Sequence, residues 1–93
     1  MSDPREILVL ARRDHLEAMR VAAGLTIFGH RVRLVFMDRP VTEAAASSEQ
    51  AELLELAGIE PETTLAEMAP PLPLLDRSGL AAALAAAELV VNL

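Results

Sequence analysis

The sequence predicts an α/β fold in which helices cover both faces of a small, mainly parallel sheet of four to five strands, a three-layer α/β/α arrangement. The short continuous apolar run at residues 7–11 is typical of a parallel strand that is buried on both faces, and residues 32–37 predict a second strand. Helix-start signals follow these segments, and strands that alternate with helices imply right-handed crossovers. With 93 residues, the chain is expected to form one domain, residues 1–93.

The first half of the chain predicts a strand at residues 7–11, a helix, and a second strand at residues 32–37. Asp14, with Glu17 three positions later, is typical of a capping box and predicts that the helix begins there. Gly29 fits the left-handed position that follows a helix. The helix carries a wide apolar surface that we expect to be buried, formed by Leu16, Met19, Ala23 and Ile27 and broadened by Ala18, Val21, Ala22, Leu25 and Phe28.

The second half is less regular. A second helix, capped by either Thr42 or Ser47, is expected to end at Gly58. Residues 63–68 predict a short strand within a proline-rich segment. A third helix, capped by Asp76 or Ser78, then leads into a final strand that spans residues 88–93.

Composition excludes several classes of function. The formal net charge of −6 argues against non-specific nucleic-acid binding, which depends on basic side chains that neutralise phosphates. Because cysteine is absent, disulfides, thiolate catalysis and cysteine metal sites are impossible, and the two histidines predict no metal site. No phosphate-binding or nucleophile motif is present, so we expect no cofactor and favour a protein that is not an enzyme. No apolar run fits a signal peptide or a membrane span, which predicts a cytoplasmic protein without membrane contact.

Polar side chains follow the ends of the first two predicted strands. Arg12, Arg13 and His15 come after the first strand, and Asp38 and Arg39 come after the second. In parallel α/β sheets, ligands gather beyond the carboxyl ends of the strands, so this edge is the candidate site. Arginines near a helix N-terminus can hold an anion, and a histidine there can bind the ligand or relay a proton.

A purely structural interpretation of the same residues stays open. In that interpretation Asp14 caps the helix, the arginines are solvated or paired with Asp38, and His15 is a surface residue of the first helical turn. We then expect that replacing Arg13 and His15 with alanine leaves folding nearly intact. His30 lies at the opposite edge of the predicted sheet and is expected to be a turn residue that hydrogen-bonds backbone.

Residues 17–25 (EAMRVAAGL), residues 29–38 (GHRVRLVFMD) and the ending AELVV at residues 87–91 resemble the DsrE-like sulfur-relay family, which includes DsrE, DsrF, DsrH and the Tus proteins. The resemblance implies a three-layer α/β/α fold, small subunits that associate into dimers, trimers or hexamers, and a bacterial cytoplasmic setting. Active members carry sulfur as a persulfide on a cysteine in the region that corresponds to residues 63–75 here. This chain has no cysteine, so the transfer activity is not carried over to any residue.

Two hypotheses of function follow from these observations. The first is a non-catalytic DsrE-like subunit, a binding or scaffold protein of cytoplasmic sulfur relay that pairs with itself or with cysteine-bearing sulfur-relay proteins. The alternative is a small sensor or enzyme that binds an anionic ligand at the carboxyl edge of the sheet. For the first hypothesis we expect a homo-oligomer, with an interface formed by the first helix and the proline-rich segment through Met19, Ala23, Leu72, Leu74 and Leu75.

Overall fold

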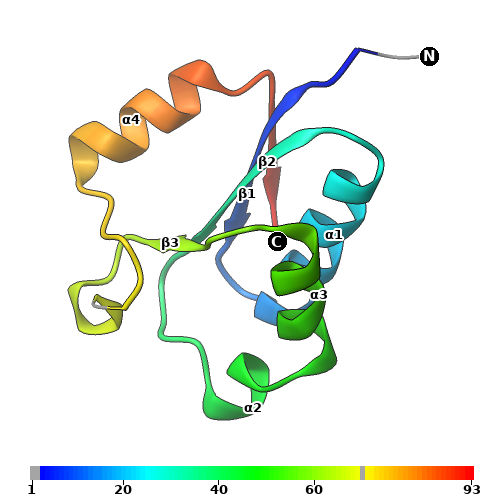
Figure 1. Ribbon diagram of the computed structural model, residues 1–93. Coiled ribbons are helices and arrows are strands. Elements are labelled where there is room, and N and C mark those ends of the chain that lie inside the picture. Colours follow the sequence, from blue (N-terminus) through cyan, green and yellow to red (C-terminus); the bar gives the residue numbers. More distant parts are fainter. Residues whose placement is uncertain (1–2, 70) are drawn as a thin grey trace.

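A four-stranded parallel sheet forms the centre of the protein (Figure 1). The computed structural model describes residues 3–69 and 71–93. All three strand pairings are parallel, and the order across the sheet is β3-β2-β1-β4. The predicted α/β class with a mainly parallel sheet is therefore confirmed. The strands are β1 (Glu6–Ala11), β2 (Arg31–Phe36), β3 (Glu62–Thr63) and β4 (Leu89–Asn92).

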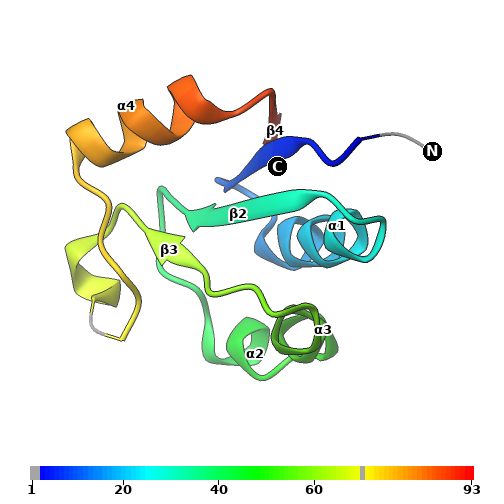
Figure 2. The same ribbon diagram turned by 45° about the horizontal axis from the view of Figure 1, so that its top comes forward.

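Helices lie on both faces of this sheet, as Figure 2 shows. Because side chains alternate along β1, Ile7 and Val9 pack on one side, whereas Leu8 and Leu10 pack on the other. The first set meets α1 and α3, and the second meets α4. The helices are α1 (His15–Ile27), α2 (Glu43–Ala46), α3 (Glu49–Ala57) and α4 (Arg77–Ala86).

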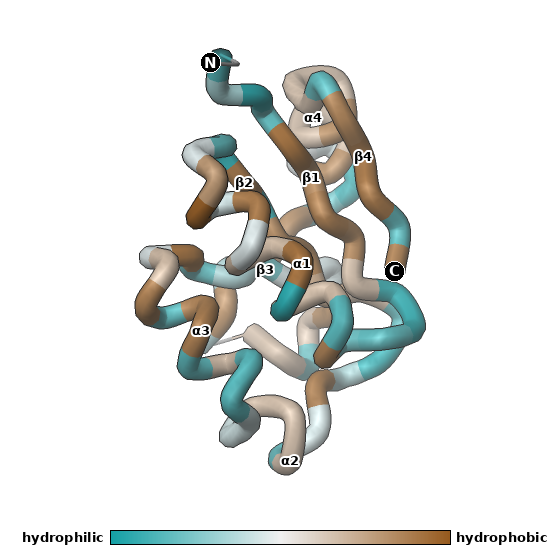
Figure 3. Tube along the Cα trace, turned by 90° about the vertical axis from the view of Figure 1, so that its right-hand side faces the viewer, coloured by the Kyte–Doolittle hydropathy of each residue, from teal (hydrophilic) through white to brown (hydrophobic). Residues whose placement is uncertain are grey.

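The strand β1 occupies the middle of the sheet and is buried along residues 7–11. Figure 3 shows hydrophobic residues along β1 and along its neighbour β4. This burial confirms the prediction that a continuous apolar run marks a strand covered on both faces. Among the described helices, none combines the length and the apolar character needed to cross a bilayer.

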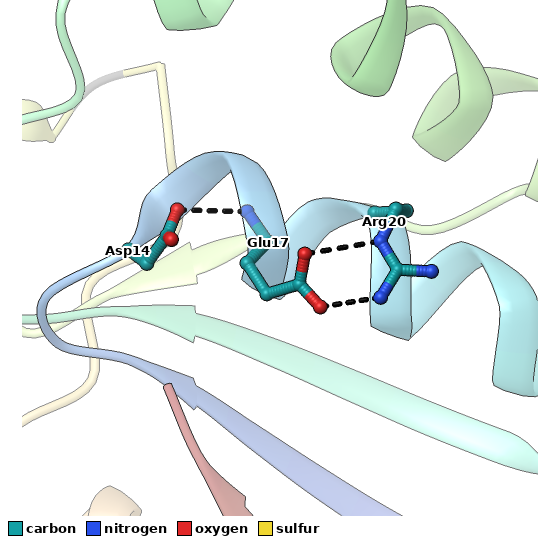
Figure 4. Close-up of polar contacts among 3 residues, drawn as sticks. All are labelled: Asp14, Glu17 and Arg20. Carbon is teal, nitrogen blue, oxygen red and sulfur yellow. Dashed lines mark hydrogen bonds and ion pairs between the residues drawn. The ribbon is translucent and has the colours of Figure 1, made fainter.

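At the start of α1, one of the two hydrogen bonds of the predicted capping box forms. The Asp14 side chain accepts a hydrogen bond from the Glu17 backbone N–H at 3.0 Å (Figure 4). The Glu17 carboxylate, however, pairs with Arg20 and does not return to the Asp14 N–H. The reason is that the Asp14 N–H already donates to the Leu93 carbonyl oxygen at 3.3 Å.

The predicted second helix is two helices. Thr42 caps α2, and Ser48 rather than Ser47 caps α3 by accepting from the Ala51 N–H at 3.2 Å. Ser47 instead ends α2. Gly58 ends α3 with a φ of 75°, the left-handed conformation predicted for it. In the last helix, Asp76 is the cap, since its side chain accepts from the Gly79 N–H at 2.7 Å.

The strand predicted for residues 63–68 is wrong beyond its first residue. The strand β3 contains only Glu62–Thr63, and a 3₁₀ turn η1 (Ala66–Met68) follows. The buried Thr63 side chain causes the bend, because its hydroxyl donates to the Phe36 carbonyl and accepts from the Leu65 N–H, each at 3.0 Å. The chain then folds back beside β3, where the Thr63 N–H donates to the Pro73 carbonyl.

The buried face of α1 also differs from the expectation. Leu16, Ile27 and Phe28 are exposed, whereas His15 at the first position of the helix is buried. The helix rests on the sheet through residues that share a 3.6-residue period, so its orientation is set by one narrow stripe. That stripe consists of His15, Ala18, Met19, Ala22 and Ala23.

Candidate functional site

The turns that follow β1 and β2 lie side by side at the carboxyl edge of the sheet. Ala11 and Phe36, the last residues of the two strands, are register partners. The Arg12 Nε atom lies 3.1 Å from the Asp38 Oδ2 atom, and the Arg39 side chain donates to the Arg13 carbonyl. The structure therefore brings the sequence-predicted residues of the two turns together.

Asp38 adopts an unusual backbone conformation in the second turn. Its φ is 69°, in the left-handed region, where aspartate is more frequent than most non-glycine residues. The next residue, Arg39, donates its backbone N–H to the Met37 carbonyl at 2.8 Å, which fixes this tight turn. A residue in this region stores about 1 kcal/mol or more of strain, and such residues cluster at functional sites.

His15 is the residue whose placement departs most from expectation. It is 6% exposed, so the prediction of a surface residue is wrong. Its ring meets the Phe36 ring edge-on with centroids 5.2 Å apart, and its buried Nε2 atom has no hydrogen-bond partner among the described residues. Burial lowers the pKa of His15, and the nearby positive charge of Arg39 lowers that pKa further. The ring is thus held in its neutral form more strongly than a solvated histidine.

A cavity of about 520 Å³ lies beside His15 at the N-terminus of α1. Arg13, His15 and Arg39 line it together with the cap residue Asp14. Arg12 and Asp38 do not line this cavity, because they turn to a smaller one, of about 280 Å³, on the β4 side. The wall that the sequence did not predict comes from α2 and its cap, through Thr42, Ala44 and Ala45.

Arginine side chains supply charged donors to the larger cavity. Within residues 3–69 and 71–93, Arg12 pairs with Asp38, but Arg13 and Arg39 form no ion pair. The backbone N–H groups of Arg12, Arg13 and Asp14 all converge on the Leu93 carbonyl oxygen, at 2.8 to 3.3 Å. These three amides are therefore already used. The guanidinium groups of Arg13 and Arg39 line the cavity, and that of Arg39 also donates to the Arg13 carbonyl.

Other residues singled out from the sequence lie elsewhere. The His30 Nδ1 atom accepts from the Arg5 backbone N–H at 3.1 Å, which confirms its role in a turn. In the part of the chain that the structure describes, no group of three or more metal-ligating side chains is found.

The predicted interface residues divide into buried and partly exposed ones. Met19 and Ala23 are buried in the core between α1 and the sheet, so they cannot present a surface to another subunit. Leu72 and Leu75 are half-buried and pack against the two core clusters. Leu74 is the member of this set with an exposed side chain.

The spacing of His15 in the sequence could have predicted its burial. His15 precedes Ala18, Met19 and Ala22 at spacings of three, four and seven, the spacing of one helical stripe.

Comparison with protein-family models, with curated proteins and with solved structures finds no match for this chain.

Proposed function

We propose that this protein is a cytoplasmic, non-catalytic binding protein for a small oxyanion, held at the carboxyl edge of the sheet. The observation that carries the proposal is the cavity of about 520 Å³ that Arg13, Arg39 and His15 line together at the N-terminus of α1.

The charges of the cavity favour an anion. Two guanidinium groups without ion pairs face one carboxylate, that of Asp14, whose Oδ1 atom already accepts from the Glu17 N–H. Guanidinium groups recognise carboxylate and phosphate oxygens through paired N–H donors.

Titration with inorganic phosphate tests this function, with sodium chloride used to keep the ionic strength constant. We expect saturable binding by calorimetry, and we expect Arg13→Gln with Arg39→Gln to weaken it about tenfold, which corresponds to about 1.4 kcal/mol. The matched control is Arg5→Gln with Arg77→Gln, which removes the same charge from arginines outside the cavity. Equal weakening in both double variants, or no binding by the unaltered protein, would refute the proposal.

We also propose, on the resemblance to the DsrE-like family, a role as a non-catalytic subunit that associates with itself and with cysteine-bearing partners. Three exposed apolar side chains support association: Ile27, Phe28 and Leu56 are 74%, 84% and 85% exposed. Both α1 and α3 run from the carboxyl edge of the sheet toward its amino edge, and they contact each other. Ile27, Phe28 and Leu56 lie at the C-terminal ends of these helices, so the three side chains share the amino edge of the sheet. This surface differs from the one expected at Met19 and Ala23.

Light scattering at micromolar concentration tests the association. We expect at least twice the mass of the chain, and a lower mass for Phe28→Ser with Leu56→Ser, because polar side chains weaken an apolar interface. The control is Leu16→Ser with Leu84→Ser, which alters exposed leucines outside this surface: Leu16 begins α1 at the carboxyl edge, and Leu84 is on α4, which packs on the other face of the sheet. A monomeric unaltered protein would exclude self-association and leave the oxyanion proposal untouched.

A further inference from the structure

A second and larger cavity, of about 580 Å³, lies on the other side of α2. Its floor consists of the buried side chains Met19, Phe36 and Leu54. The 3₁₀ turn η1 supplies one wall, where the Met68 sulfur lies 3.6 Å from the Thr63 hydroxyl oxygen. This cavity is therefore set apart from the oxyanion site by α2 and has a different, apolar lining.

The size of the cavity indicates a small organic molecule. Volumes of about 300 to 1,000 Å³, with mostly apolar walls and a few polar groups, are typical of small-molecule sites. Methionine side chains such as Met19 and Met68 adapt to ligands of different shape, because they are unbranched and polarisable. An apolar chain that enters the cavity leaves water, which favours binding in proportion to the area buried.

The charge of the lining indicates the polar group of that molecule. Glu55 from α3 and Glu67 from η1 both line the cavity and both are exposed. Among the described residues that line it, these carboxylates are the charged ones, and neither forms an ion pair within residues 3–69 and 71–93. A cation at the opening would complement both, whereas an anion would be repelled.

We propose that this cavity binds a small organic ammonium ion, with its apolar chain against Phe36 and Leu54 and its ammonium group between Glu55 and Glu67. The oxyanion site and this cavity then select ligands of opposite charge on the two sides of α2. The proposal is independent of oxyanion binding, since Arg13, His15 and Arg39 do not line this cavity.

Three probes of equal chain length test the proposal: octylammonium, octanol and octanoate. We expect octylammonium to bind about fivefold more tightly than octanol in calorimetry, as two exposed ion pairs of about 0.5 kcal/mol each would give. Octanoate is expected to bind most weakly. Glu55→Gln with Glu67→Gln should bring the three affinities close together, because the carboxylates are lost while the apolar walls remain.

Two further variants keep the test decisive. Glu52→Gln with Glu60→Gln removes the same charge from exposed positions that do not line the cavity, and it should preserve the preference for octylammonium. Ala51→Leu places a larger side chain on the cavity wall and should weaken all three probes. The proposal is overturned if octanoate equals octylammonium in the unaltered protein, if the preference survives in the Glu55 and Glu67 variant, or if no probe binds.

Discussion

His15 links the local chemistry of the candidate site to the stability of the fold. Its pKa is lowered by burial first and by Arg39 second, from an ordinary value of 6.5 that applies in the unfolded chain. Between the folded pKa and 6.5, the unfolded state therefore binds more protons than the folded state. The contribution of His15 to the free energy of unfolding consequently rises with pH through that window and is constant above it.

A comparison of urea denaturation at pH 7.5 and at pH 5 measures this effect. We expect the unaltered protein to be less stable at the lower pH, and we expect His15→Gln to show a smaller difference between the two pH values. The variant loses the contact with Phe36 and is less stable at both pH values. The quantity to compare is therefore the difference in the free energy of unfolding between the two pH values. An unchanged difference in His15→Gln would show that other groups cause the pH dependence.

Thr63 is the polar residue that determines the course of the chain after β3. It is fully buried, and its hydroxyl bonds both the Phe36 carbonyl and the Leu65 N–H. Thr63→Val keeps the shape of the side chain but leaves the Leu65 N–H without this acceptor. We expect a loss of about 1–3 kcal/mol in the free energy of unfolding, measured by urea denaturation. Thr64→Val, at the half-buried neighbour, is the control and should change stability by less than about 0.5 kcal/mol.

At the scale of single elements, glycine is required at Gly58 but not at Gly24. Gly58 ends α3 with a φ of 75°, whereas Gly24 lies inside α1, where an added Cβ would meet nothing within 4 Å. Gly58→Ala is therefore expected to destabilise the protein by about 1–2 kcal/mol, the cost of the left-handed conformation for an L-residue. Gly24→Ala should stabilise it by about 0.5–1 kcal/mol, because alanine restricts the unfolded chain and favours the helix.

Thermal denaturation of the two variants, each against the unaltered protein, checks this pair. The melting temperature should fall for Gly58→Ala and rise for Gly24→Ala. A fall in both would indicate that the exposed face of α1 near Gly24 is covered in solution, for example by another subunit.

The elements that local signals specify could be predicted from the sequence, and the others could not. The run at residues 7–11, the cap Asp14 and the terminator Gly58 act through their own neighbours, and each is found where predicted. Ser47 and Ser48 have the same intrinsic ability to cap, so the choice between them depends on how α3 packs against α1.

The same distinction holds for the candidate site. Its place at the carboxyl edge follows from strand order, and the contact between Arg12 and Asp38 agrees with that prediction. The burial of His15 depends on how α1 is rotated against the sheet, and an apolar surface around most of the helix left that rotation ambiguous. The use of the Arg13 and Asp14 amides by Leu93 joins residues at opposite ends of the sequence, so no local pattern could predict it.

At the scale of the whole molecule, α2 and the ring pair of His15 and Phe36 separate the two cavities. Thr42, Ala44 and Ala45 line the oxyanion site, whereas Ala46 lines the apolar cavity. Phe36 lines the apolar cavity and also touches His15, which lines the other. The ends of β1 and β2 therefore lie beside both cavities, for which we propose ligands of opposite charge.

The two faces of the sheet are covered unequally, and this asymmetry yields the last prediction. The α1 side is covered by α1, α2 and α3, whereas in the described residues α4 is the helix on the other side (Figure 2). Its buried contact is Ala83, which packs with Leu8, Leu10 and Val35. A small side chain at this point lets the helix approach the sheet closely.

Ala83→Leu would add three carbon atoms where the helix meets the sheet, and α4 would have to move outward or distort. We expect a loss of about 1–3 kcal/mol in the free energy of unfolding, the usual cost of overpacking a core. The matched control is Ala82→Leu, at an exposed position of the same helix, which should stay within about 0.5 kcal/mol of the unaltered protein. Urea denaturation measures both. If the two variants behave alike, α4 is held too loosely for its packing at Ala83 to stabilise the third layer of the fold.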